Sequence, residues 1–226
     1  MTFSIAARCV RTGQFGVAVS SSSPAVAARC SYARAGVGAV SSQNITDPSL
    51  GPRILDLMSL GASAPEALSV VSHSTENIEF RQLTAVDALG CAASFSGEHT
   101  LGVHAAMIAD NVVCAGNLLK NDTIPSQMVS AFDGCVNEDL ADRLLQAMQA
   151  GVAAGGEEGS IHSAGLLLVD KYSWPVANLR IDWHEVGSPI EELSRLWRRY
   201  APQLNDYVMR AINPASAPGY GVPGEE

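Results

Sequence analysis

The order of strand-like and helix-like segments restricts the possible fold of this chain more than any other feature. Apolar runs typical of strands occur in groups, and these groups are separated by segments of helical period. Strand-like segments occupy residues 3–10, 15–20, 35–41, 81–87, 91–95, 104–109, 112–115, 164–170 and 175–181, and helix-like segments occupy residues 47–60, 64–71, 125–132, 138–151 and 190–212. This grouping, with hairpins throughout, argues against a doubly wound parallel sheet. Two antiparallel sheets packed together with helices outside would accommodate every segment.

Length and composition favour one globular domain. The chain has 226 residues, of which 47% are hydrophobic and 16% charged, and this excludes disorder over most of its length. We predict a single domain over residues 1–212 and a Pro- and Gly-rich tail over residues 213–226. The tail cannot form a core element, and the helix before it carries several aromatic residues. Both features favour contact with a second subunit, and we predict a homodimer.

Charge and cysteine content narrow the class of function. The chain has 23 acidic and 14 basic residues, a formal net charge of −9, and this argues against a nucleic-acid partner. Five cysteines without CxxC spacing and histidines without a zinc-binding pattern predict neither a metal site nor another cofactor. Without a membrane-length apolar run or a signal-peptide pattern, we expect a cytoplasmic protein without a membrane partner that acts on a small molecule.

Thr2 is the sharpest candidate for chemistry. A small residue after Met1 permits removal of that methionine, which would give Thr2 a free α-amine beside its hydroxyl. An α-amine titrates at about 7.7–8.0, so Thr2 could use its own amine as the general base for its hydroxyl. Ser4 lies two residues further along, on the same face of the predicted strand, where it would orient the amine or line the pocket.

Several segments together resemble one protein family. The chain contains MTFSIAARC and FGVAVSSSSPAVAARC near its start, then CAGNLL, AAGGEEGSIHSAGLLLV and LRIDWHEVGSPIEELSRLWRRY in the same order. Over residues 2–200 this pattern resembles the bacterial DUF1028 family. The resemblance implies an α+β fold, the four-layer αββα sandwich of two mainly antiparallel sheets found in N-terminal-nucleophile (Ntn) hydrolases.

The serine-rich loop at residues 20–24 follows the second predicted strand. We expect Ser21 and Ser22 to contact substrate. The resemblance places Lys or His near Ser22 in relatives, where a charge would lower the pKa of the nucleophile, and Ser22 itself cannot do this. Arg29 or Lys120 would be the available substitutes. The structural alternative is a small polar loop that ends at Pro24.

Two further segments offer polar groups beside strands. Asn44 and Asn117 are candidate donors to an oxyanion, and Gln43 and Asp47 are candidate substrate contacts. The alternatives are local. Asp47 would cap a helix with Pro48 at its first position, Asn44 would bond to nearby backbone, and Asn117 would form a turn with the preceding glycine.

Residues 151–159 combine four glycines or alanines in a row with two acids, and we expect a flexible loop. Glu157 and Glu158 are either a solvated acidic tip or part of a lid that meets a cationic substrate. Taken together, the sequence predicts an Ntn-type amidohydrolase that cleaves a small-molecule C–N bond through Thr2 after Met1 removal. The alternative is a non-catalytic ligand-binding or structural protein that retains the fold.

Overall fold

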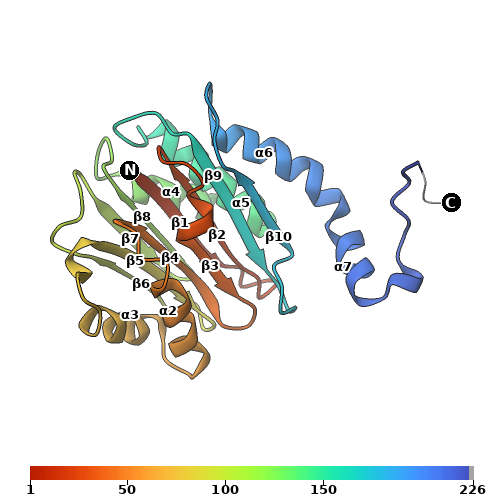
Figure 1. Ribbon diagram of the computed structural model, residues 1–226, viewed down its shortest axis with the longest axis horizontal. Helices are drawn as coiled ribbons and strands as arrows, with labels where there is room; N and C mark the ends of the chain where they lie inside the picture. Colours follow the sequence, from red (N-terminus) through yellow and green to blue (C-terminus); the bar gives the residue numbers. More distant parts are fainter. Residues whose placement is uncertain (224–226) are drawn as a thin grey trace.

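Two antiparallel sheets stacked face to face form the centre of the molecule (Figure 1). We describe residues 1–223 of a computed structural model. The six-stranded sheet has the order β10-β9-β2-β1-β8-β7, from β1 (Thr2–Arg8), β2 (Phe15–Ser21), β7 (Ala105–Ala109), β8 (Val112–Asn117), β9 (Ser163–Val169) and β10 (Ala177–Ile181). The four-stranded sheet has the order β3-β4-β5-β6, from β3 (Ser31–Arg34), β4 (Gly38–Asn44), β5 (Arg81–Asp87) and β6 (Ala92–Ser96).

Helices cover the outer face of each sheet. On the four-stranded sheet lie α2 (Leu50–Ser59) and α3 (Ala64–His73), and on the six-stranded sheet lie α4 (Ile124–Gly134), α5 (Leu140–Ala153) and α6 (Pro189–Tyr200) (Figure 1). Every strand pair is antiparallel. The predicted fold class, an αββα sandwich of two antiparallel sheets, is therefore confirmed.

Side-chain alternation along β1 explains why this strand is central to both the core and the site. Phe3 and Ile5 point to the helices and belong to the largest apolar cluster of the fold. Ser4 and Ala6, which are out of phase with them, face the second sheet, where Ser4 bonds to Gln43. Because the side-chain period of a strand is two, Thr2 also faces the layer between the sheets.

The structure differs from the predicted segments in three places. The predicted helix over residues 190–212 is interrupted by a 3₁₀ turn at Ala201–Gln203, where Pro202 has no N–H to donate. The segment before β4 was not predicted as regular structure, and it contains α1 (Ala27–Cys30) and β3. Finally, α2 begins at Leu50, whereas Asp47 and Pro48 lie before the helix.

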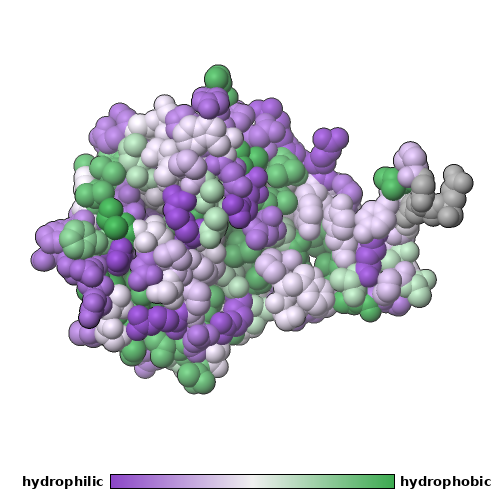
Figure 2. All heavy atoms as spheres, viewed as in Figure 1, coloured by the Kyte–Doolittle hydropathy of each residue, from purple (hydrophilic) through white to green (hydrophobic). Residues whose placement is uncertain are grey.

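The end of the chain extends away from the sandwich. The last helix, α7 (Leu204–Ile212), buries none of its residues, and Figures 1 and 2 show it projecting beyond the sheets. The tail folds back on this helix, because Arg210 donates to the carbonyls of Pro218 and Gly219. The last three residues of the predicted tail lie outside the described part of the chain.

Within residues 1–223, no helix combines the length and apolar character needed to cross a bilayer. The same residues contain no group of three or more His, Cys, Asp or Glu side chains arranged to hold a metal ion.

Candidate active site

The start of β1 lies between the ends of its two neighbouring strands. Thr2 is paired in register with Ser21 of β2 on one side and with Asn117 of β8 on the other. Ser21 and Asn117 are fully buried, and Thr2 is 6% exposed. The antiparallel pairing therefore brings three residues that are far apart in sequence to one end of the layer between the sheets.

The Thr2 hydroxyl lies beside a carbonyl group that belongs to the preceding residue. Thr2 Oγ1 is 2.6 Å from the Met1 carbonyl oxygen, and Ser21 Oγ donates to the same oxygen at 2.5 Å. Thr2 Oγ1 also lies 3.3 Å from Ser21 Oγ. This oxygen belongs to the Met1–Thr2 peptide bond and accepts from both hydroxyls, so removal of Met1 would free both hydroxyls for another acceptor.

A chain of hydrogen bonds connects this carbonyl to Arg29. Arg29 Nη2 donates to Ser23 Oγ at 2.6 Å, and Ser23 Oγ lies 2.8 Å from Ser21 Oγ. Because a guanidinium can only donate, and because Ser21 donates to Met1, the bonds run in one direction, from Arg29 through the two serines to the carbonyl oxygen. Successive bonds polarise one another, so the Arg29 charge strengthens the last donor in the chain.

A network of buried amide side chains lies between the two sheets, next to Thr2. Asn117 Nδ2 donates to Gln82 Oε1 at 3.1 Å, and Gln43 Nε2 donates to the same oxygen at 2.8 Å. Gln43 Oε1 accepts from Ser4 at 2.7 Å and from Ser41 at 3.2 Å, and its amide also donates to a backbone carbonyl. Gln43 therefore has no amide hydrogen left for a substrate, and Ser4 lies beneath the site as its partner.

The amide oxygen of Asn117 is different, because Asn117 Oδ1 is buried and has no hydrogen-bond partner among the described residues. Its amide group thus presents an unused acceptor at the end of β8, and of its two N–H hydrogens one is donated to Gln82. An acceptor beside the first residue of β1 suits the α-amine that Met1 removal would create there.

Asn44 and Asp47 are held by local contacts. Asn44 Nδ2 donates to the Phe80 carbonyl at 2.6 Å, and its oxygen accepts from the Leu101 N–H at 3.2 Å. Asp47 accepts from the backbone and hydroxyl of Ser49, and the hydroxyl bond is the main reason that its pKa is lowered. Among residues 1–223, neither side chain forms a hydrogen bond with Thr2. Asn44 bonds to nearby backbone, as its alternative expects, but Asp47 does not cap the helix with Pro48 at its first position, because Ser49 is the N-cap of α2.

Glu157 reaches the site from the glycine-rich segment after α5. This segment is attached to the end of β8, since Lys120 N–H donates to the Gly156 carbonyl and Glu158 N–H donates to the Leu118 carbonyl. Glu157 is only 3% exposed, and its Oε2 accepts from the Ser22 N–H at 3.1 Å. The predictions of a flexible loop and of a solvated tip at Glu157 are therefore wrong.

Burial raises the pKa of Glu157 to about 8, although the nearby N-terminal ammonium and the bonds from Ser22 act in the opposite direction.

Two basic residues, Lys120 and Arg29, were considered as substitutes for a charged side chain at position 22, and their contacts differ. Lys120 is paired with Glu158 at 3.1 Å, on the exposed side of the segment, whereas Arg29 is linked to Thr2 through serines.

The sequence did not single out Gln82 as part of this site, and it offered Ser23 only as part of the serine-rich loop and Glu157 only as one of two alternatives. Gln82 carried a usable signal, because a glutamine inside an otherwise apolar strand requires buried partners. Glu157 carried a weaker one in its neighbouring glycines, of which Gly155 and Gly156 have positive φ angles of 127° and 63°. Such angles indicate a defined backbone path.

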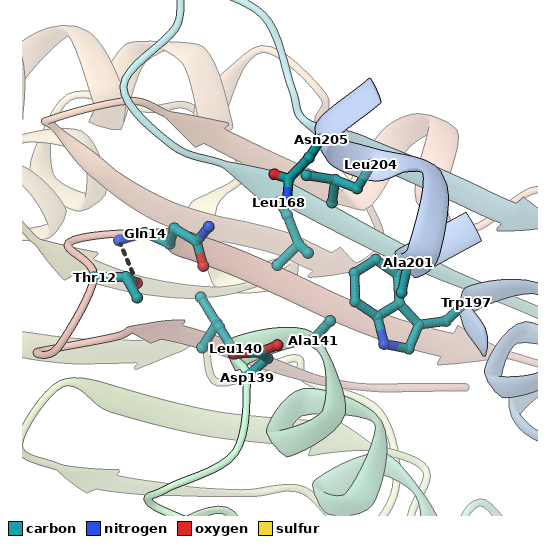
Figure 3. Close-up of a pocket in the computed structure, with 10 residues that line it drawn as sticks. All are labelled: Thr12, Gln14, Asp139, Leu140, Ala141, Leu168, Trp197, Ala201, Leu204 and Asn205. Atoms are coloured by element: carbon teal, nitrogen blue, oxygen red, sulfur yellow. Dashed lines mark hydrogen bonds between the residues drawn. The ribbon is translucent and has the colours of Figure 1, made fainter. Parts of the chain in front are cut away.

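Other cavities lie elsewhere. Figure 3 shows a pocket of about 190 Å³ at the turn between β1 and β2, at the opposite end of the hairpin from Thr2. Leu140, Leu168 and Trp197 project toward it from α5, β9 and α6. The hydrogen bond drawn there, from Gln14 N–H to Thr12 Oγ1, stabilises the turn itself. This pocket is separate from the polar groups around Thr2.

The fold and the site together define a class. Two antiparallel sheets between helical layers, with the first strand of the chain central in one sheet, form a four-layer αββα sandwich. Residues 2–193 match the family described as "Family of unknown function (DUF1028)". The chain belongs to the DUF1028 family.

Solved structures include one that is similar to this chain in sequence and fold. A DUF1028 protein from Silicibacter pomeroyi shares 28% identity at a TM-score of 0.82, over 88% of this chain and 89% of that one. Anbu, the ancestral β-subunit, from Yersinia bercovieri shares 12% identity at a TM-score of 0.41, over 97% and 100% of the two chains. An Anbu mutant from a Hyphomicrobium strain shares 11% sequence identity at a TM-score of 0.42, over 90% of this chain and 96% of that one. TM-scores this low do not establish a relationship. No curated protein sequence matches the chain.

Proposed function

We propose that this protein is an Ntn-type amidohydrolase that cleaves a small amide C–N bond with Thr2 after Met1 is removed. The observation that carries the proposal is the arrangement around Thr2 Oγ1. Its oxygen lies 2.6 Å from a carbonyl oxygen that Ser21 also binds at 2.5 Å. The Thr2 hydroxyl and a second donor thus lie together beside one carbonyl group, and acyl transfer would require the hydroxyl oxygen to turn from the carbonyl oxygen to the carbonyl carbon.

The reaction follows from these groups. The Thr2 oxygen attacks the carbonyl carbon while the hydroxyl proton passes to the Thr2 α-amine, and the carbonyl oxygen gains negative charge. Ser21 Oγ donates to that oxygen, supported through Ser23 by Arg29. The C–N bond then breaks, and the leaving nitrogen takes the proton from the α-amine. Water hydrolyses the resulting ester, which releases the acid and restores the hydroxyl and amine.

The buried amides hold the amine in place. Met1 removal would leave an amine at the end of β1, paired in register with Asn117, whose Oδ1 has no other partner among residues 1–223. A hydrogen bond from the amine to this oxygen would fix its orientation toward the hydroxyl. Gln82 holds the Asn117 amide by accepting from its nitrogen. In this proposal Asn117 is a positioning residue.

The experiment compares Thr2→Ala and Thr2→Ser with the wild type, each prepared without Met1 and checked by mass. A panel of small amides is screened for release of ammonia or amine. We expect Thr2→Ala to lose at least about 10³-fold in kcat/KM, because the nucleophile is absent, while Thr2→Ser retains measurable turnover. Undiminished activity in Thr2→Ala would place the nucleophile elsewhere. Binding of amides without turnover by any form would favour the non-catalytic alternative.

A further inference from the structure

Glu157 has one carboxyl oxygen that nothing in the fold uses. Its Oε2 accepts from the Ser22 N–H, whereas Oε1 is buried without a hydrogen-bond partner among the described residues. A buried carboxyl oxygen without a donor is costly, and native structures pair such atoms in nearly every case. Glu157 is therefore suited to receive a donor from a bound molecule.

A cleft opens beside this carboxyl group. It has a volume of about 270 Å³, and Glu157 lines it together with Gly156, Gly159, Ile161 and Gly187. The glycines leave the backbone accessible to a bound molecule. The segment is held in place by its bonds to residues 118 and 120, so the cleft has a fixed wall. The cleft is large enough for a few heavy atoms, and Gly159 in its lining is the residue that the end of the Met1 side chain approaches.

Met1 shows what fits between Thr2 and Glu157. Its carbonyl oxygen accepts from Ser21, and its terminal methyl lies 2.8 Å from the position that a Cβ on Gly159 would occupy. Its ammonium is close enough to Glu157 for the positive charge to lower the pKa of the carboxyl group against the effect of burial. Met1 thus presents a carbonyl, an α-ammonium and a side chain to three different parts of the site.

We infer that, provided Thr2 acts as proposed above, the substrates are amides whose acyl part carries a free α-amine, and that Glu157 binds this ammonium. Gly159 leaves room for an unbranched side chain such as that of methionine. Glu157 is then a specificity residue of the same site. An ammonium group suits the carboxyl because it supplies N–H donors to an oxygen that has none, and because its positive charge favours the ionised form of the acid.

Glu158 provides a matched control, since it is the next residue and has the same side chain. It is exposed and paired with Lys120 at 3.1 Å, so its carboxyl group faces away from the cleft. Glu158→Gln removes an exposed carboxylate from the same segment, and it therefore shows any effect that comes from loss of negative charge alone. Any effect specific to Glu157 is therefore separated from a general loss of negative charge.

The experiment uses Met1-free protein and two probes, methionine p-nitroanilide and its N-acetyl derivative. For the wild type we expect kcat/KM to favour the free amine by about 10–100-fold, the range of a hydrogen-bonded charge. Glu157→Gln should reduce this ratio to below about threefold, and Glu158→Gln should retain it. Equal rates for the two probes with the wild type, or an unchanged ratio in Glu157→Gln, would overturn the inference.

Binding separates this inference from the proposed catalysis. Met1-free Thr2→Ala protein is titrated by calorimetry with methioninamide and with N-acetylmethioninamide. Two results together support the ammonium site: Thr2→Ala protein binds methioninamide more tightly than the acetylated compound, and the double variant Thr2→Ala/Glu157→Gln does not. This conclusion holds even where no form of the protein turns over an amide. Turnover of the acetylated probe alone supports the proposed catalysis and rejects the ammonium site. Absence of both binding and turnover for methionine amides also rejects it.

Discussion

The two ends of the layer between the sheets differ in character, although the same strands run through both. The apolar end consists of Ala6, Phe15, Val17, Ala39, Val86, Val113 and Val169. The polar end consists of Thr2, Ser4, Ser21, Gln43, Gln82 and Asn117, all buried. Along β1, the change occurs between Ala6 and Ser4, which are consecutive residues on one face of the strand.

We expect the apolar end to contribute mainly to the free energy of unfolding, and the polar end mainly to the proposed chemistry. Burying apolar surface contributes about 25 cal/mol per Å², whereas a buried hydrogen bond contributes little net free energy and is costly when a partner is missing. The polar end includes one such atom among the described residues, Asn117 Oδ1, and Thr84 Oγ1 is another at the boundary between the two ends. We therefore expect substitutions at the apolar end to affect unfolding, and substitutions at the polar end to affect activity.

The largest expected effect on stability is at the apolar end. Phe15→Ala removes a ring that is 2% exposed, and we expect it to lower the free energy of unfolding by about 3–5 kcal/mol. Denaturant titration measures this loss. The fraction that remains folded should keep the wild-type kcat, because no group at the polar end is changed. A loss of kcat in fully folded protein would show that the two ends are coupled.

At the polar end, Ser21→Ala should reduce kcat/KM of Met1-free protein by about 10²–10³-fold, since it removes the donor to the carbonyl oxygen. The control is Ser20→Ala. Ser20 is adjacent and equally buried, but its hydroxyl donates to the Ser163 carbonyl at 3.0 Å. Comparable losses in the two variants would mean that the effect comes from the strand and not from the donor.

The raised pKa of Glu157 predicts that the stability of the protein with Met1 depends on pH. Its pKa is raised from 4.5 to about 8 in the folded state, so folding favours the protonated form. The resulting stability is present in full below about pH 4.5 and is lost as the pH rises through about 8. Unfolding titrations from pH 5 to 8 should show the wild type losing up to about 1.4 kcal/mol per pH unit relative to Glu157→Gln.

Both proteins in this comparison retain Met1, and Glu157→Gln removes only the buried carboxyl group. Glu158→Gln keeps the buried carboxyl group and should follow the wild-type curve. Parallel curves for the wild type and Glu157→Gln would contradict the assignment of a protonated, buried carboxyl to Glu157.

The smallest expected effect is that of Thr84→Val, a substitution that would add one apolar side chain next to the apolar end. Thr84 lies on β5 between Val86 and Gln82, and its buried hydroxyl has no hydrogen-bond partner among residues 1–223. Thr84→Val keeps the shape and removes the unpaired group, so we expect a gain of about 1 kcal/mol in the free energy of unfolding. A calorimetric melting temperature below that of the wild type would show that Thr84 has a partner in solution.

The sequence predicted the fold well because its main determinants are local. The alternation at 3–10 and 15–20 and the turn between them predicted the central hairpin, which the structure forms as β1 and β2. Gly13 in that turn has a positive φ of 76°, a value that glycine adopts without strain. The break at Pro202 was missed because the apolar spacing continues on both sides of it.

The candidate site was only partly predictable because its contacts are long-range. Thr2 was evident from its position, and the strand register places it beside Ser21 and Asn117. For Glu157 the sequence left open a solvated tip or a lid that meets a cationic substrate, since an acidic pair among glycines has no apolar neighbours in sequence. Its burial depends on pairing with the segment after β8 and on the Ser22 N–H, which local patterns do not reveal.

The most direct test of the account is whether Thr2 becomes acylated. Met1-free protein is mixed with an activated acyl ester and quenched in acid, which keeps the α-amine protonated and prevents transfer of the acyl group from oxygen to nitrogen. We expect a hydroxylamine-sensitive mass increase of one acyl group on the N-terminal peptide, absent from Thr2→Ala and from protein that retains Met1. An equal increase in Thr2→Ala, or acylation at another residue only, would contradict Thr2 as the nucleophile.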